Sequence, residues 1–341
     1  AQILGDSFGN VVHLFERDCS IQRRNQKLIE IAPSPQLTPE QRAYIGDLSV
    51  RAAKAVGYEN AGTVEFLLAE GEVYFMEMNT RVQVEHTITE EITGIDIVRE
   101  QIRIASGLPL SVKQEDIQHR GFALQFRINA EDPKNNFLPS FGKITRYYAP
   151  GGPGVRTDTA IYTGYTIPPF YDSMCLKLVV WALTWEEAMD RGLRALDDMR
   201  LQGVKTTAAY YQEILRNPEF RSGQFNTSFV ESHPELTNYS IKRKPEELAL
   251  AIAAAIAAHA ACEEYKNEQE DLRNRHHPAR RPPIVAGHPH AHRRHAADLR
   301  QARQSRLLVP GSLGRRDLRR LRTLFERRPV GAPAQTARRI A

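Results

Sequence analysis

The stretch EMNTRVQVEH, residues 77–86, places a polar side chain at every second position. Successive residues of a strand point to opposite sides, so these side chains would share one face of an extended chain. A solvated strand face needs some polar groups, but not two carboxylates, two amides and a guanidinium in succession. The stretch is therefore a candidate functional site, formed by Glu77, Asn79, Arg81, Gln83 and Glu85.

The segment that leads into it, AGTVEFLLAEGEVYFMEMN at 61–79, has one apolar run on each side of the triplet EGE at 70–72. A hairpin with this triplet as its loop would pair Leu67 with Phe75 and Glu65 with Glu77. Directly opposed side chains have Cβ atoms about 5 Å apart, and like charges at that distance are destabilising. A divalent cation between the carboxylates would remove the repulsion, because hard cations bind carboxylate oxygens. Two ordinary exposed strand acids are the alternative interpretation.

The helices that must position these residues have recognisable ends. Thr38 is an N-cap candidate before Pro39, Gln41 completes a capping box, and Gly57 ends this helix. Further helices are expected at 89–106 with a break near Gly94, from Thr184 to about Leu201, and after Lys205.

Besides the hairpin around residues 70–72, strands are expected at three places in the first 180 residues. Two short strands flank GDSFGN within 1–16, a polar loop follows at 17–27, and more strands lie within 142–180. The segment GFALQFRIN, residues 121–129, alternates between an apolar face and a polar face that carries Gln125, Arg127 and Asn129. Since strands and helices interleave, the pattern alone leaves the class as α+β or α/β, and the family resemblance described below implies α+β.

Charge is distributed unevenly along the chain. Residues 267–341 contain 18 Arg, no Lys and six acids, a net charge of +12, whereas the whole chain carries only +5. The first 266 residues are therefore acidic, at −7, and give no indication of nucleic acid binding. Three cysteines without paired spacing indicate a reducing compartment, and no apolar run could span a membrane, so we expect a cytoplasmic protein.

The basic segment at the end allows three interpretations. It could bind nucleic acid or acidic partners, it could be a disordered extension, or it could be an out-of-frame translation of a GC-rich gene end. Arginines without interleaved aromatics are weak evidence for a nucleic acid site, so we favour the last two.

Five motifs, taken together and in order, resemble the biotin carboxylase family: ERDCSIQRRNQK, VEF, MEMN, RVQVEH and FRINAEDP. These ATP-grasp enzymes carboxylate biotin in acetyl-CoA, propionyl-CoA and pyruvate carboxylases. The resemblance covers residues 1 to about 240 and implies a C-terminal fragment that starts inside the ATP-grasp domain. The implied division is the C-terminal half of an ATP-grasp domain at 1–107, the biotin carboxylase C-terminal domain with its mixed sheet and helices at 108–240, an Ala-rich helix at 241–265, and a disordered or non-native basic tail at 266–341.

The resemblance assigns a role to each residue of the polar stretch. Glu65, Glu77 and Asn79 would hold Mg²⁺ or Mn²⁺ against the ATP phosphates. The bicarbonate pocket would consist of Arg81, Gln83 and the backbone N–H of Val84. Glu85 would be the general base that removes the bicarbonate proton.

Residues outside the stretch receive roles from the same resemblance. Arg127 would stabilise the biotin enolate, although taken alone it would be better interpreted as a surface ion pair with Glu131 or Asp132, and the motif around it reverses that preference. Lys27 would lie near the phosphates and bicarbonate. The nucleotide contacts would be Gln22, Glu77, Thr227 and Asn25, the last at a position where many family members carry His.

The resemblance also implies partners: a biotin carboxyl carrier protein or domain, a carboxyltransferase subunit, and a second copy in a homodimer. It does not distinguish acetyl-CoA, propionyl-CoA or pyruvate as the final acceptor. Two other functions remain open, namely another ATP-grasp ligase such as a carbamoyl-phosphate synthetase, and a non-catalytic dimerisation fragment. As a fragment, the chain is expected to have negligible ATP turnover alone.

Overall fold

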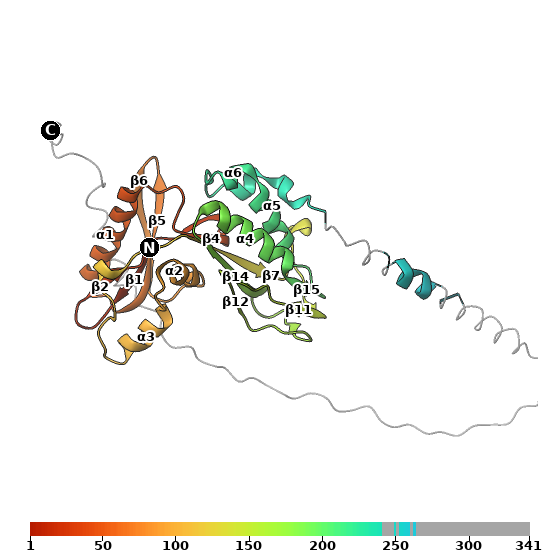
Figure 1. Ribbon diagram of the computed structural model, residues 1–341, viewed down its shortest axis with the longest axis horizontal. Coiled ribbons are helices and arrows are strands. Elements are labelled where there is room, and N and C mark those ends of the chain that lie inside the picture. The colour runs from red at the N-terminus through yellow and green to blue at the C-terminus, as the bar shows by residue number, and fades with distance from the viewer. Residues whose placement is uncertain (241–248, 250–251, 260–261, 264–341) are drawn as a thin grey trace, which may run out of the picture. The chain divides into compact units, whose positions relative to one another are not determined.

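The computed structural model describes residues 1–240, 249, 252–259 and 262–263, and residues 1–240 form the body considered below (Figure 1). Its main strands are β1 (Gln2–Gly5), β2 (Val11–His13), β3 (Asp18–Arg23), β4 (Gln26–Ala32), β5 (Asn60–Ala69), β6 (Glu72–Asn79), β7 (Phe122–Asn129), β12 (Val155–Thr159) and β14 (Met174–Ala182). The helices are α1 (Pro39–Ala55), α2 (His86–Thr93), α3 (Ile97–Ala105), α4 (Trp185–Asp198), α5 (Ala208–Arg216), α6 (Pro218–Arg221) and α7 (Phe229–Ser232). Short strands complete the body: β8 (Glu131–Asp132), β9 (Leu138–Pro139), β10 (Gly142–Lys143), β11 (Arg146–Tyr148), β13 (Thr166–Ile167) and β15 (Arg200–Gln202).

Two antiparallel sheets organise this body. One has the strand order β2-β1-β5-β6 and contacts α1 and α3, and the other has the order β12-β14-β7-β4-β3. Helix α4 packs on β14 and β7 of the second sheet, over a core that includes Leu124, Phe126 and Ile128. These are apolar residues of the alternating segment at 121–129, so the predicted apolar face is confirmed.

The prediction of a polar loop at 17–27 is wrong. These residues form most of the β3–β4 hairpin, and β4 pairs with β7 inside the second sheet. Arg24 and Asn25 make the turn with φ of 49° and 64°. A glycine usually indicates this conformation in a sequence, and the turn contains none. Strands from 18–32 thus complete a sheet whose other strands lie after residue 120, and the division at residue 107 stays a prediction.

Helix α2 covers the polar face of the second sheet. Its Ile88 and Ile92 pack against Ala123 of β7 and Val179 of β14. The helix lies between the two sheets (Figure 1) and its first residue directly follows Glu85. The sequence prediction started this helical region at residue 89, three residues too late, but located its break correctly at Gly94, which caps α2 with φ of 70°.

Helix α1 confirms the local signals that predicted it. Thr38 accepts a hydrogen bond from the Gln41 backbone N–H, and Gln41 accepts one in return from Thr38. The second capping box, at Thr184 and Glu187, is also present, but α4 ends at Asp198, and residues 200–202 form β15.

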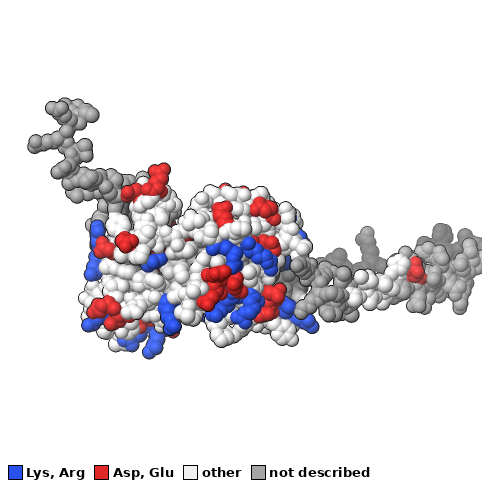
Figure 2. Space-filling view, turned by 45° about the horizontal axis from the view of Figure 1, so that its top comes forward, with Lys and Arg blue, Asp and Glu red and all other residues white. Residues whose placement is uncertain are grey.

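Acidic and basic side chains are interspersed on the face of the body shown in Figure 2, without a continuous basic surface. The described residues include no helix long and apolar enough to cross a membrane. Of the Ala-rich segment predicted as a helix at 241–265, the described residues are helical. The basic tail predicted at 266–341 lies outside the described residues.

Candidate active site

Lys27 lies at the centre of a hydrogen-bonded network that joins seven of the predicted site residues. Its Nζ atom is 2.7 Å from Oε1 of Glu85 and 3.2 Å from Oε1 of Glu65. It thereby connects strand β4 of one sheet to β5 of the other and to the residue before α2. The other members of the network are Glu77, Asn79, Gln83 and Arg127.

Glu65 accepts hydrogen bonds from three of these residues at a single oxygen. Besides Lys27, the Nε2 of Gln83 donates at 2.6 Å and the Nδ2 of Asn79 at 3.1 Å. The same Nδ2 donates to Glu77 at 3.0 Å, so the amide of Asn79 lies between the two carboxylates. Glu65 and Glu77 are direct cross-strand partners, as predicted, but the predicted pairing of Leu67 with Phe75 is wrong, because Leu67 pairs with Tyr74.

Glu85 is buried, with 2% of its side chain exposed, and both carboxylate oxygens are occupied by cations. Lys27 binds Oε1, and Nη2 of Arg127 donates to Oε2 at 2.9 Å. Burial on its own would raise the pKa of Glu85, but Arg17, Lys27 and Arg127 outweigh it and lower the pKa to about 2. The carboxylate is therefore ionised at neutral pH.

A fully buried acid, Glu30 of β4, holds Arg127 from its other side. Nε of Arg127 donates to Glu30 at 2.5 Å, and Nε2 of Gln125 donates to the second carboxylate oxygen at 2.9 Å. Burial raises the pKa of Glu30, and Arg127 opposes that shift. Arg127 forms no ion pair with Glu131 or Asp132, the alternative suggested by the sequence.

Glu30 is not among the residues predicted from the sequence, although a signal for it was present. Glu30 is a single acid inside the apolar run LIEIA, and a carboxylate buried in a strand needs a cationic or donor partner. Arg127, which the resemblance had already singled out, is that partner.

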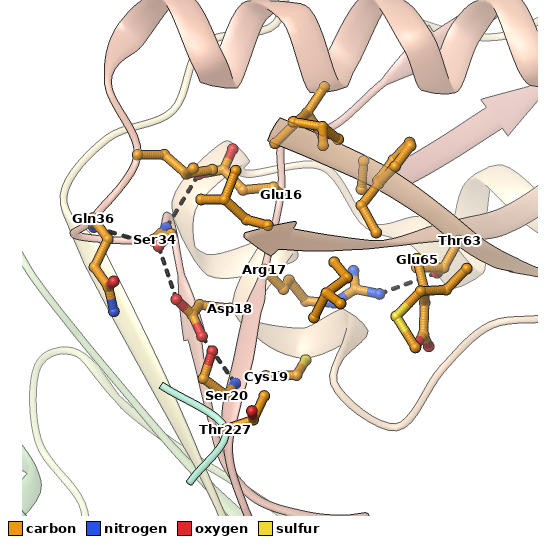
Figure 3. A pocket seen from close by; sticks show the side chains of 18 of the residues that line it. Glu16, Arg17, Asp18, Cys19, Ser20, Ser34, Gln36, Thr63, Glu65 and Thr227 are labelled. Atoms are coloured by element: carbon orange, nitrogen blue, oxygen red, sulfur yellow. Dashed lines mark hydrogen bonds between the residues drawn. The ribbon is translucent and has the colours of Figure 1, made fainter. Parts of the chain in front are cut away.

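Arg17 is a second functional candidate that the sequence analysis missed. It precedes β3 and extends toward Thr63 and Glu65 of β5 (Figure 3), where it donates to Thr63 at 3.1 Å and to Oε1 of Gln83 at 2.9 Å. Nothing in the local sequence distinguishes it from Arg23 or Arg24, since its partners are distant in the chain.

The polar stretch at 77–86 is a strand only as far as Asn79, so the prediction of one continuous strand face is wrong. Residues 80–85 form a loop, in which Gln83 and Glu85 are buried and Arg81 is exposed. Arg81 donates to the carbonyl of Val82 at 3.2 Å and takes no part in the network around Lys27. The carbonyl of Val84 accepts from Lys177 at 3.2 Å.

A cavity of about 330 Å³ opens beside the network. Five predicted residues line it: Gln22, Lys27, Glu65, Gln83 and Thr227. Apolar side chains, including Leu67, Met76 and Phe225, form another part of the wall. Asn25 is at the exposed tip of the β3–β4 turn and is not one of the lining residues. The cavity therefore offers charged groups near Lys27 and an apolar surface, which suits a ligand with an anionic end and a flat apolar end.

The donor set at the β5–β6 hairpin fits Mg²⁺. Glu65, Glu77 and Asn79 supply only oxygen ligands once the Asn79 amide turns its carbonyl inward, and two opposed carboxylates attract a divalent cation. Mg²⁺ commonly takes one or two carboxylates and completes its shell with phosphate oxygens and water. The described residues contain no cluster of three or more His, Cys, Asp or Glu that would form a metal site of protein ligands alone.

Two family models match the chain in succession. Residues 1–113 match "Carbamoyl-phosphate synthase L chain, ATP binding domain", and residues 125–232 match "Biotin carboxylase C-terminal domain". The boundaries are close to the division predicted at residue 107, although the β3–β4 hairpin from the first match completes the sheet of the second.

Curated relatives are similar over the same region. The 2-oxoglutarate carboxylase small subunit of Hydrogenobacter thermophilus is 55% identical over 259 residues, which are 76% of this chain and 55% of that protein. Biotin carboxylase 1 of Bacillus subtilis is 53% identical over 234 residues, 68% of this chain and 52% of the relative. The chain thus spans about half the length of the relatives it matches.

Solved structures agree with these relatives. The biotin carboxylase domain dimer of the Hydrogenobacter thermophilus 2-oxoglutarate carboxylase, in complex with MgADP, ADP and bicarbonate, is similar at a TM-score of 0.69 and 56% identity. This match covers 70% of the present chain and 53% of that one. The α+β arrangement of an ATP-grasp portion followed by a second mixed domain is therefore confirmed.

Proposed function

We propose that this chain, which belongs to the biotin carboxylase family, supplies the acid–base and metal-binding part of an enzyme that carboxylates biotin with ATP and bicarbonate. The observation that carries the proposal is the Glu85 carboxylate, held between Lys27 and Arg127 beside a pair of opposed acids. One carboxylate thus lies between two cations that could each bind a reacting oxyanion, next to a site for a phosphate-bound metal.

The nucleotide would lie along the cavity, with its phosphates toward Lys27. Glu65, Glu77 and Asn79 would hold Mg²⁺, which when bound neutralises charge on the phosphates. The apolar side chains of Leu67 and Met76 suit the adenine ring, and Gln22 and Thr227 also line the cavity. Asn25 would contact the nucleotide only after the β3–β4 turn moved toward the cavity.

Bicarbonate would bind where Gln83 and Lys27 converge, with the Val84 backbone N–H as a further donor. Arg81 would have to turn from the Val82 carbonyl to bind the anion through two parallel N–H groups, a geometry that arginine offers and lysine lacks.

Glu85 is already ionised and can accept the bicarbonate proton. With a pKa near 2 it is a weak base, and general bases work best when their pKa is near the operating pH. An anion that binds Lys27 would withdraw positive charge from Glu85 and raise its pKa. The base would thus gain strength when bicarbonate and ATP arrive, after which carboxyphosphate can form and decompose to CO₂ and phosphate.

Arg127 would stabilise the biotin enolate that then attacks CO₂. Its guanidinium is anchored at Nε by Glu30, which leaves the Nη groups directed at Glu85 and the reacting centre. Stabilisation of a developing oxyanion by a preorganised donor is typically worth a factor of 10² to 10³ in rate.

The partners follow from the same proposal: a biotin carboxyl carrier protein or domain, a carboxyltransferase subunit, and a second copy of the chain in a homodimer. The final acceptor, which could be an acyl-CoA or a 2-oxo acid, would be chosen by the carboxyltransferase. The cysteines Cys19, Cys175 and Cys262 are all free, which supports a reducing compartment such as the cytoplasm.

The test is ADP formation by this chain joined to the part of the Hydrogenobacter small subunit that it does not match, with and without bicarbonate and free biotin. The chain alone is a parallel sample, for which we expect negligible turnover. Glu85→Gln and Arg127→Ala should each reduce turnover at least 100-fold, while Glu72→Gln, at the exposed start of β6, should not change it.

Turnover that requires both bicarbonate and biotin would support the proposal. Turnover without any need for biotin would indicate a different ATP-grasp ligase, of the carbamoyl-phosphate synthetase kind, and would leave Arg127 without a catalytic role. An absence of turnover in the joined protein would favour a non-catalytic dimerisation module.

A further inference from the structure

Arg17 is surrounded by neutral acceptors from four separate segments. It donates to the side-chain oxygens of Gln2 at 2.8 Å, Thr89 at 2.9 Å, Gln83 at 2.9 Å and Thr63 at 3.1 Å. These residues belong to β1, α2, the loop before α2, and β5. Within the part of the chain that the structure describes, no carboxylate lies within ion-pair distance of its guanidinium.

A half-buried arginine without a carboxylate partner needs a reason, because removing a guanidinium from water is costly. The four hydrogen bonds compensate part of that cost and hold the guanidinium in one orientation. Its positive charge forms no direct ion pair but acts at longer range on the Glu85 carboxylate, and Arg17 lines the wall of the cavity.

The contact with Gln83 determines which end of that amide meets the pocket. Arg17 carries only donors, so it must face the carbonyl oxygen Oε1 of Gln83. The NH₂ group is then on the other side, where Nε2 donates to Glu65 at 2.6 Å. If the amide were rotated, its oxygen would face the Glu65 carboxylate and its NH₂ would face Arg17, so both contacts would become repulsive.

We propose that Arg17 is a positioning residue that holds the Gln83 amide with its NH₂ group toward the oxyanion pocket, so that Gln83 acts as a hydrogen-bond donor to bicarbonate. The inference rests on the proposed function and extends it to Arg17, a residue of the motif ERDCSIQRRNQK to which the resemblance assigned no role. Arg17 itself needs no contact with bicarbonate, because it acts through the orientation of Gln83.

The test is a ¹³C-bicarbonate NMR titration of the 341-residue chain and its variants. Arg17→Met removes all four hydrogen bonds and should weaken bicarbonate binding about tenfold or more, the effect expected for loss of one hydrogen bond that involves a charged group. Gln83→Met should weaken it to a similar degree. In the double variant the two losses should not add, because Arg17 has no amide left to orient.

Two further variants separate positioning from charge and from folding. Arg17→Lys keeps the positive charge but cannot reproduce the planar set of donors, so it should also weaken binding; a purely electrostatic role would leave this variant near the unsubstituted chain. Arg51→Met removes an exposed arginine of α1 that pairs with Asp47 and with none of the site residues, and it should change bicarbonate affinity less than twofold. Urea unfolding identifies any variant that does not fold, and the pair Arg17→Lys and Gln83→Met completes the cycle if Arg17→Met fails.

Additive losses, or unchanged binding in folded Arg17→Lys and Arg17→Met, would overturn the inference. An unsubstituted chain that binds no bicarbonate would also overturn it, while leaving the proposed function to its own turnover test. A non-additive loss together with unchanged binding in Arg51→Met is the result that supports it.

Discussion

Glu65 and Glu77 are direct partners across the β5–β6 hairpin, although the turn between them contains two residues and not three. The ladder starts with Ala69 opposite Glu72, and an even count back from there would pair Glu65 with Met76. The register shifts between Glu65 and Phe66, so one extra residue on β6 restores the pairing with Glu77. A bulge at this place directs both carboxylates to the same side, which is a frequent use of bulges next to functional sites.

The first prediction is that Mg²⁺ with ADP stabilises the chain through this pair of acids. Ligand binding to the folded state raises the melting temperature according to concentration and affinity. Glu65→Gln and Glu77→Gln each remove one carboxylate. Each should weaken about tenfold the apparent affinity for Mg²⁺ that is obtained from the Mg²⁺-dependent rise in melting temperature. Thermal unfolding with ADP, with and without excess EDTA, measures this part.

The matched control is Glu72→Gln, on the same strand but opposite Ala69. A Mg²⁺-dependent shift that survives in both site variants, or disappears equally in the control, would refute the metal site.

The second prediction concerns the turn itself. Glu70 and Gly71 have φ of 53° and 82°, the left-handed pair typical of a two-residue hairpin turn that favours Asn-Gly. Glu70→Asn should raise the free energy of unfolding by about 0.5 kcal/mol, because Asn adopts this conformation more easily than Glu. Gly71→Ala should lower it by about 1 kcal/mol for backbone reasons alone, since an added Cβ would meet nothing within 4 Å.

Urea unfolding provides both values. Glu70→Gln, which removes the charge but keeps the unfavourable backbone, serves as the control and should give a smaller gain than Glu70→Asn. An equal gain in the two variants would attribute the effect to charge and not to the turn.

Local signals predicted the longer helices of the body, α1 to α5, whereas the four-residue helices α6 and α7 were not predicted. The capping boxes at Thr38 and Thr184 consist of residues three apart in the chain. The end of α2 at Gly94 is determined by the left-handed backbone conformation of that glycine. The β3–β4 hairpin was not predictable in the same way, because most residues of β3 and the first two of β4 are polar and the turn has no Gly. Its β4 strand is stabilised by pairing with β7, about 95 residues later, a contact that no local pattern records.

The site was predictable where its residues share a short stretch and not where they converge from a distance. The opposed acids and the buried Glu85 come from 65–85, so spacing and motif sufficed. Arg17 was missed since its role depends on four acceptors spread over 88 residues of the chain, from Gln2 to Thr89. Arg81 shows the converse error, because its alternation with Gln83 continues after the strand has ended.

A third prediction is that Arg127→Lys fails although it keeps the charge. Arg127 binds Glu30 through Nε and Glu85 through Nη2, and a single ammonium group cannot make both contacts. The fully buried Glu30 would lose its cation, so the free energy of unfolding should fall by about 3 kcal/mol. In the joined protein, biotin-dependent turnover should fall about 100-fold.

The control for this change is Arg216→Lys, an exposed arginine paired with Glu213 three residues earlier in α5. Neither stability nor turnover should change measurably there. If Arg127→Lys were as stable and active as the parent, the two-sided anchoring of Arg127 would have no functional importance.

The fourth prediction is that Glu85 makes folding depend on acidity. Its pKa falls from 4.5 to about 2 on folding, because Arg17, Lys27 and Arg127 outweigh the effect of burial. A lowered folded-state pKa gives stability that is present above the unfolded value and is lost as the pH falls through the folded value. Glu85 should therefore contribute about 3 kcal/mol at neutral pH, and this contribution should decline between about pH 5 and pH 2.

Urea unfolding of the parent and of Glu85→Gln across this range gives the contribution as the difference between the two curves. The difference should be largest at pH 6 to 7 and should narrow steadily below pH 5, as protonation makes the parent resemble the variant. Salt should reduce the difference, because the pKa of Glu85 is lowered by nearby cations. The reduction in 1 M salt should be modest, because screening is weak for a side chain that is 2% exposed. A difference that stays constant with pH would show that the Glu85 charge does not stabilise the fold, and that the contacts with Lys27 and Arg127 serve the reaction alone.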